Sequence, residues 1–302
     1  MNDPPSKQDM TKLTRGLVFP LMVLVIGATA CAQRPTTGPG AGGTPPPTGR
    51  NSLVLRVEAA GGLLAPAAAL TQVPEFSLFG DGRVITAGPQ IEIYPGPALP
   101  NLRVTTISQD AIQVILQAAR AAGLFGPDRH YLSAVVADAP TTTFTLVAAG
   151  VRHVISANAL GVDTGHPSGQ MSEQERLARV ALQAFRAKLS NLATWLPKGS
   201  IGQDRVYVPT GLRVFAQAGA PDQQPGLREP VINWPLAVPL ASFGSPLPTA
   251  PGLRCGAIAG TDLAKLLPVA GRANQLSPWR SGGATYSVTF RPLLPDESGC
   301  PR

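Results

Sequence analysis

Charge, aromatic side chains and catalytic motifs are all scarce in this sequence. Charged residues make up 14% of the chain and aromatic residues 5%, whereas glycine and proline number 32 each. So much Gly and Pro predicts many turns and few long helices. No H-E-x-x-H motif, no Walker loop and no G-x-G-x-x-G fingerprint after an expected strand is present, so the sequence gives no support to metalloprotease, P-loop or dinucleotide-binding chemistry.

A serine-nucleophile motif is missing as well. Residues 165–169, GHPSG, place a serine among glycines without the G-x-S-x-G spacing, and Pro167 is incompatible with the strand-to-helix turn that such a serine needs. These absences predict a protein without catalytic activity, and we expect no cofactor.

The net charge is +7, but the arginines are scattered singly and form no run or stripe. A solvated basic surface is therefore expected rather than a nucleic-acid interface. A basic protein outside the cytoplasm could also meet anionic lipid headgroups or an anionic wall polymer.

The stretch from 13 to 31, LTRGLVFPLMVLVIGATAC, organises the N-terminal part of the chain. Basic residues end at Arg15, and residues 17–26 form an apolar run that is short for a permanent membrane span. Small residues at 27–30 lead directly to Cys31. This order resembles the lipobox signal peptide of bacterial lipoproteins.

The resemblance implies that residues 1–31 are a signal peptide ending at a lipidated, palmitate-bearing Cys31. It also implies an extracytoplasmic protein anchored in the cell membrane. The remainder of the sequence carries no motif that identifies a family. Residues 32–50 are rich in Gly, Pro and Thr and predict a disordered tether.

Two cysteines remain after Cys31, and an oxidising compartment leaves them one possible pairing. We therefore predict a disulfide between Cys255 and Cys300, which closes a loop of about 45 residues. A redox or metal pair would need the closer C-x-x-C spacing.

Residues 51–197 predict an α+β module in which antiparallel hairpins pack against helices. Gly80-Asp81-Gly82 suits a hairpin turn, Ser108 and Ser172 suit helix N-caps, and Gly123 suits a helix C-terminus. An apolar helix face is expected at Leu177, Val180, Ala181, Ala184, Phe185, Leu189 and Leu192. The expected strands are 53–58, 75–79, 83–86, 91–93, 102–107, 143–147 and 151–157, and the expected helices are 108–122 and 172–196.

Residues 198–302 predict a second, Pro-rich αβ module. Its expected elements are two strands, 205–208 and 212–216, about a turn at 209–211, further strands at 253–255 and 284–290, and a helix at 262–274 capped by Thr261. The Pro-rich segment 219–252 predicts either an extended wrap over the surface or an exposed docking strip. Because the segments from Leu102 and Leu253 align as strand, helix and strand, we also raise the hypothesis of two related modules.

One cluster of side chains offers an alternative with chemistry. Strands 143–147 and 151–157 are expected to form a second hairpin. If the loops around this hairpin converge, the cluster could bind a divalent metal and serve a metal-dependent hydrolase. No two of the histidines have a metal-binding spacing, and each residue also suits an ordinary turn or strand position. The cluster consists of Asp128, His130, Asp138, His153, Asp163 and His166.

Trp234, Trp279 and Arg280 lie in Pro-containing sequence and could line a ligand groove, although packing of the two tryptophans in the core is the simpler interpretation. We expect a lipid-anchored envelope module that binds another protein or a wall component. The alternatives are a hydrolase that uses the region of Asp128, His130, His153 and His166, and a small-solute-binding lipoprotein.

Overall fold

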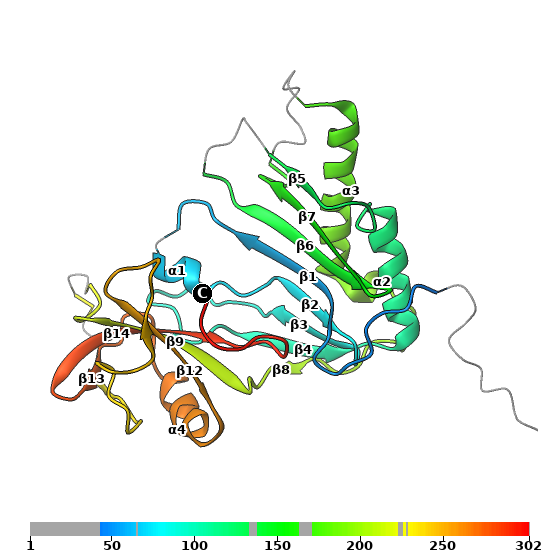
Figure 1. Ribbon diagram of the computed structural model, residues 1–302. Coiled ribbons are helices and arrows are strands. Elements are labelled where there is room, and N and C mark those ends of the chain that lie inside the picture. The colour runs from blue at the N-terminus through cyan, green and yellow to red at the C-terminus, as the bar shows by residue number, and fades with distance from the viewer. Residues whose placement is uncertain are drawn as a thin grey trace, which may run out of the picture. The chain divides into compact units, whose positions relative to one another are not determined.

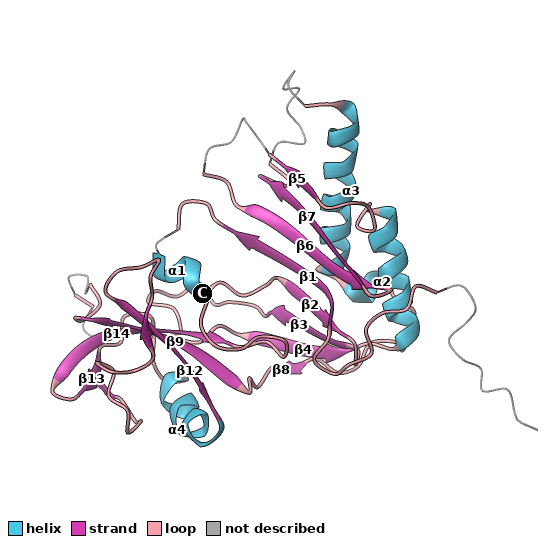
Figure 2. Ribbon diagram, in the orientation of Figure 1, coloured by secondary structure: helices cyan, strands magenta, loops and turns pink. Residues whose placement is uncertain are grey.

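The structure is a computed structural model that describes residues 43–64, 66–132, 138–162, 171–222, 226–227 and 229–301. Two mixed, mostly antiparallel sheets and three substantial helices make up an α+β fold, as expected (Figures 1 and 2). No helix within these ranges has the length and apolarity needed to cross a membrane.

The first sheet has eight strands in the order β5-β7-β6-β1-β2-β3-β4-β8, and only the β5–β7 pair is parallel. Helices α2 (Gln109–Ala121) and α3 (Glu173–Leu189) cover one of its faces (Figure 1). The strands are β1 (Leu53–Ala60), β2 (Phe76–Phe79), β3 (Arg83–Ala87), β4 (Leu102–Thr106), β5 (Arg129–Tyr131), β6 (Thr141–Ala148), β7 (Val151–Asn158) and β8 (Arg205–Val206).

Both predicted hairpins are confirmed. β2 and β3 pair across Gly80–Gly82, and β6 and β7 pair across Ala149 and Gly150. Ala149 and Gly150 both have positive φ, 50° and 75°, which is the backbone of a type I′ turn and matches the twist of the flanking strands. The strand expected at 91–93 does not form, because this segment belongs to a proline-containing loop outside both sheets.

Helix α2 begins and ends as its sequence predicts. The Ser108 side chain accepts a hydrogen bond from the Ala111 backbone N–H at 3.2 Å. At the other end Gly123 has φ +86°, and the Leu124 N–H donates to the Ala119 carbonyl at 3.0 Å. This closing pattern is the one that a C-terminal glycine permits.

Helix α3 differs from its prediction in length and in orientation. Ser172 caps it as expected, but the helix ends at Leu189 and a short 3-10 turn, η1 (Leu192–Thr194), follows. Leu177 and Val180, expected in the core, are 54% and 42% exposed, whereas Arg179 is fully buried. The buried face is set by Arg179, Leu182, Phe185 and Leu189, which recur at helical spacing.

The second sheet has six strands in the order β10-β13-β14-β9-β12-β11, with β10 and β13 parallel. Helix α4 (Gly260–Ala270) packs on it through Leu263 and Leu266, while α1 (Pro66–Thr71) contacts β14. The strands are β9 (Gly211–Ala218), β10 (Ile232–Asn233), β11 (Ser245–Pro246), β12 (Leu253–Ala259), β13 (Trp279–Ser281) and β14 (Ala284–Pro292).

Three expectations for this region are wrong. Strands 205–208 and 212–216 do not flank a common turn, because β8 pairs with β4 in the first sheet and β9 lies in the second. Thr261 is not a cap, since α4 already begins at Gly260 after Ala259, whose side chain offers no hydrogen bond. The helix also stops at Ala270, four residues earlier than predicted.

The Pro-rich segment wraps the second core. Leu236, Leu240 and Phe243 from this segment are all buried in the same cluster as Trp279. This supports the wrap and leaves the docking strip without support. The predicted disulfide between Cys255 and Cys300 is present, and it spans 45 residues of sequence.

The hypothesis of two related modules finds no support in the strand order. In the first segment, the two aligned strands are β4 before α2 and β6 after it, and three strands (β1, β2 and β3) lie between them in the sheet. In the second, the aligned strands are β12 before α4 and β14 after it, and a single strand, β9, lies between them. The resemblance between Leu102 onward and Leu253 onward therefore reflects two Ala-rich strand–helix units.

Residues 43–50, expected at the end of the tether, contact the first sheet and α2. The Pro45 carbonyl accepts from the Ala149 N–H at 2.8 Å, and the Thr44 carbonyl accepts from the Gln113 side chain at 3.1 Å. The predicted tether of 32–50 is therefore wrong for residues 43–50, which belong to the folded region. Residues 32–42, Cys31 and the predicted signal peptide lie outside the described ranges.

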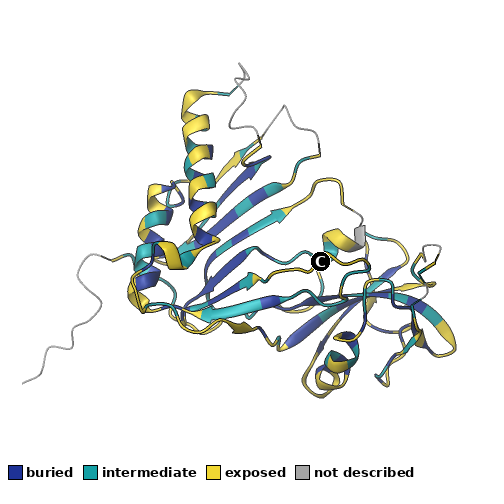
Figure 3. Cartoon of the chain, turned by 180° about the vertical axis from the view of Figure 1, so that it is seen from behind, coloured by how far each residue is buried: buried dark blue, intermediate teal, exposed yellow. Residues whose placement is uncertain are grey.

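The outer strands of both sheets are short. β5 has three residues, and β8, β10 and β11 have two each. The long strands, β1, β6, β7, β9 and β14, all lie inside a sheet with a neighbour on each side. Figure 3 shows buried residues concentrated on these strands and on the inner sides of the helices.

Candidate functional site

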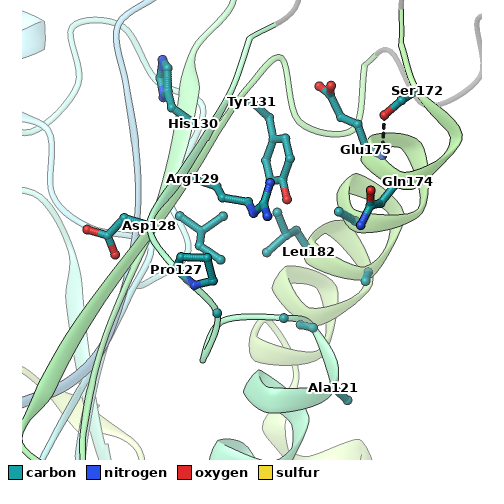
Figure 4. A pocket seen from close by; sticks show the side chains of 16 residues that line it. Ala121, Pro127, Asp128, Arg129, His130, Tyr131, Ser172, Gln174, Glu175 and Leu182 are labelled. Carbon is teal, nitrogen blue, oxygen red and sulfur yellow. Dashed lines mark hydrogen bonds between the residues drawn. The ribbon is translucent and has the colours of Figure 1, made fainter.

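A cavity of about 680 Å³ lies between the C-terminal end of α2, strand β5 and the first turns of α3. The alternation of β5 decides which side chains face it. Arg129 and Tyr131 extend toward α3, whereas His130 points to the other side of the sheet (Figure 4). Opposite orientation of successive side chains is the normal pleat of a strand.

The opposite wall of the cavity is the N-terminal part of α3. Ser172 accepts a hydrogen bond from the Glu175 N–H at 3.2 Å, and Gln174 and Glu175 contribute polar side chains (Figure 4). Glu175 Oε1 lies 3.8 Å from Nη1 of the buried Arg179, so a neighbouring cation balances its negative charge.

Arg179 fixes this wall against the sheet. Its guanidinium donates to the backbone carbonyls of Asn158, at the end of β7, and Tyr131, at the end of β5. A buried guanidinium needs several acceptors, and the strand ends supply carbonyls that no further residue of β5 or β7 uses. The sequence analysis did not identify this residue, because the two carbonyls that hold it belong to strands far along the chain.

One cation of the cavity, Arg129, has no ionic partner. Within the described ranges, no hydrogen bond or ion pair engages its side chain. Asp128 also lines the cavity, but its carboxylate points away from Arg129, and its Oδ1 accepts from the Val154 N–H at 2.8 Å (Figure 4). The arrangement therefore suits a ligand that carries an anionic group together with hydrogen-bonding groups.

The residues considered as metal ligands are spread over both faces of the first sheet. His130 Nδ1 makes a short hydrogen bond with Ser156 Oγ, and His153 Nδ1 lies 3.0 Å from the Gly126 carbonyl oxygen. Ser156 and His153 are three residues apart on β7, so their side chains emerge on opposite faces. The His153 ring also packs on Phe125, with centroids 5.7 Å apart.

The other three residues add no cluster. Asp138 occupies a turn with φ 54°, and Asp163 and His166 lie outside the described ranges. In the part of the chain that the structure describes, no three His, Cys, Asp or Glu side chains come together to hold a metal ion.

Trp234 and Trp279 are core residues. Trp279 is fully buried, and Trp234 stacks edge-on against it at 5.9 Å while donating its ring N–H to the Val238 carbonyl at 2.9 Å. Arg280 is exposed on β13. The three therefore do not line a common groove, and packing was the correct interpretation for the tryptophans.

Comparison of this chain with protein-family models, with curated proteins and with solved structures finds no match.

Proposed function

We propose that this chain is a lipid-anchored, extracytoplasmic binding module of the bacterial cell envelope, without catalytic activity, whose partner is an anionic wall polymer. The observation that carries the anchoring half is the disulfide. Cys255 and Cys300 pair with each other, and Cys31 is the third cysteine of the sequence. Disulfides persist in oxidising compartments, which agrees with the lipobox resemblance.

The anchor is tested by metabolic labelling of bacteria that express the full chain with an alkyne analogue of palmitate. Label is expected on the intact protein and lost in Cys31→Ala, with the protein moving from the membrane fraction to the soluble fraction. Cys300→Ala serves as the matched control and keeps its label. Label retained by Cys31→Ala, or absent from the intact protein, contradicts the anchor.

The binding half is supported by the cavity beside α3. Arg129 contributes a positive charge that no ion pair within the described ranges engages, and Tyr131 and Gln174 offer hydrogen bonds beside it. A charge-assisted bond to an anion is worth about 1.5–3 kcal/mol, which corresponds to roughly tenfold or more in affinity.

Co-sedimentation of the purified protein with isolated cell-wall sacculi tests this half independently of the anchor. Binding should weaken at least about tenfold for Arg129→Glu, which reverses the charge that contacts the ligand. Arg272→Glu is the matched control, because Arg272 is exposed at the end of α4 and remote from this cavity. Sacculi stripped of their anionic polymer should not bind, and equal binding of both variants contradicts the proposal.

A small-solute receptor is the second candidate, because about 680 Å³ lies within the range of small-molecule sites. In that case short soluble fragments of the polymer bind as tightly as the intact polymer and compete with it for the cavity.

A further inference from the structure

A second cavity, of about 650 Å³, lies in a different part of the fold. Its walls are the loop between β3 and β4, helix α1 and strand β14. We infer that this cavity is a binding site for an uncharged ligand with a substantial apolar part. The inference does not depend on the anchor or on the Arg129 cavity.

The absence of charge defines the ligand class. The residues that line this cavity include no Asp, Glu, Lys, Arg or His. The polar side chains among them are all neutral, namely those of Thr71, Gln90, Tyr94, Gln275, Ser287 and Thr289. A charged ligand group would lose its hydration here without gaining a counter-charge, so such a ligand is disfavoured, whereas a neutral one can satisfy the amides and hydroxyls.

The rim of the cavity is apolar and open. Ile91, Ile93 and Tyr94 line it, yet they are 71%, 57% and 55% exposed. Single exposed apolar residues are common on protein surfaces, but three within four consecutive residues, beside a cavity, mark an interaction site. A ligand in the cavity would remove these side chains from water.

The loop that carries the rim is fixed at both ends. On one side the Gly88 N–H donates to the Asn101 carbonyl at 2.7 Å. On the other the Gln275 N–H donates to the Gly96 carbonyl at 2.9 Å, and the Ala98 N–H to the Ala273 carbonyl at 3.0 Å. The exposed side chains therefore project from a segment whose backbone is held by hydrogen bonds at both ends.

Strand β14 forms one wall of the cavity with residues 287–290. Successive side chains of a strand point to opposite faces, so Ser287 and Thr289 project away from the second core in which Val288 and Phe290 are buried. A cavity with an apolar rim, a few neutral polar groups and a volume between about 300 and 1,000 Å³ has the ordinary character of a small-molecule site.

A matched pair of fluorescent probes tests the inference. N-phenyl-1-naphthylamine is neutral, and 8-anilino-1-naphthalenesulfonate has the same rings with one added sulfonate. The neutral probe should bind the full-length protein saturably at one site, at least about tenfold more tightly than the anionic probe. Non-specific attraction to the basic surface would give the opposite preference, because the net charge of +7 favours binding of the anionic sulfonate probe.

Two variants locate the site. Ile93→Asp should weaken binding of the neutral probe at least about tenfold, because it places a charge on the apolar rim. Val208→Asp is the matched control, since Val208 is 72% exposed and lies outside this cavity. Both positions are exposed, so thermal unfolding should show that both variants fold.

Two outcomes overturn the inference. If the anionic probe binds as tightly as the neutral one, the signal comes from the basic surface. If Ile93→Asp binds like Val208→Asp, the signal comes from another apolar segment, including the N-terminal run at 17–26.

Discussion

Arg56 Nη2 lies 2.7 Å from Asp296 Oδ1, although 240 residues of sequence separate the two. Arg56 belongs to β1 of the first sheet, and Asp296 to the C-terminal segment that follows β14 of the second. The same segment also contacts Tyr207, which follows β8 of the first sheet. The Tyr207 hydroxyl donates to the Leu293 carbonyl at 2.9 Å, and Leu294 is buried in a cluster with Tyr207. The C-terminal segment thus connects the two sheets.

The disulfide holds the end of this segment. Replacing Cys255 and Cys300 together by serine should lower the free energy of unfolding by roughly 3–4 kcal/mol, because the unfolded chain regains the freedom of a loop of about 45 residues. Denaturant unfolding monitored by tryptophan fluorescence measures the loss. A reductant should destabilise the wild-type protein by a similar amount and leave the double variant unchanged. Equal stability of the two proteins contradicts this role.

Glu297 makes the stability of the protein depend on acid. Burial opposes ionisation of its carboxyl group, but two bonds from Arg291, at 2.5 and 2.8 Å, and one from the Leu294 N–H outweigh burial and lower the pKa below its ordinary value of 4.5. The ionised group therefore stabilises the fold fully above about pH 4.5, and this contribution is lost as the pH falls through the lowered pKa.

Glu297→Gln should remove that dependence. At pH 7 the variant should be roughly 1.5–3 kcal/mol less stable, the usual value of hydrogen bonds to a charged group. The difference from wild type should shrink as the pH falls below about 4.5, which urea unfolding across a pH series measures. Glu92→Gln, at an exposed position, should follow the wild-type curve. A difference that stays constant to pH 3 contradicts the assignment.

The buried face of α3 can be tested with one charged and one apolar residue. Arg179→Ala should cost at least about 2 kcal/mol, because it leaves the carbonyls of Tyr131 and Asn158 without their donor in a buried site. Leu177→Ala should change stability by about 0.5 kcal/mol or less, since Leu177 is 54% exposed. The melting temperatures of the two variants test this prediction. If Leu177→Ala destabilises the protein more than Arg179→Ala, the apolar face predicted from the sequence is the correct one.

Two glycines with similar backbones separate steric conflict from backbone strain. Gly82 has φ +84°, and a Cβ there would lie 2.4 Å from the Ile107 carbonyl oxygen; Gly150 has φ +75° and open space around it. Gly150→Ala should cost roughly 1–2 kcal/mol from the left-handed backbone alone. Gly82→Ala should cost clearly more, because the Ile107 N–H also holds the Gly82 carbonyl at 2.8 Å and prevents relaxation. Equal melting temperatures for the two variants would contradict this.

Local signals in the sequence were sufficient for most of the elements. The Asp-Gly turn, the caps at Ser108 and Ser172 and the stop at Gly123 each depend on a few neighbouring residues, and the structure confirms them. The cysteine pair was predictable because the count left one pairing once Cys31 was assigned to the lipid.

Features set by distant contacts were not predictable. Arg179 is buried because carbonyls of two strand ends converge on it, and no local pattern encodes that convergence. The separation of β8 and β9 into different sheets likewise depends on strand partners far along the chain, Arg103 for β8 and Cys255 for β9. The cavity beside α3 was not predicted either, because only the packing of α3 on the sheet brings Arg129 and Glu175 into the lining of one cavity.

The brevity of the outer strands has a consequence for how copies of this protein meet. A sheet grows into a neighbouring molecule through a long row of free backbone N–H and C=O groups at its edge. Here the outermost strands offer only two or three residues each, and β11 ends in Pro246, which has no N–H to donate. The outermost strands themselves therefore give a second copy of the chain little backbone to pair with.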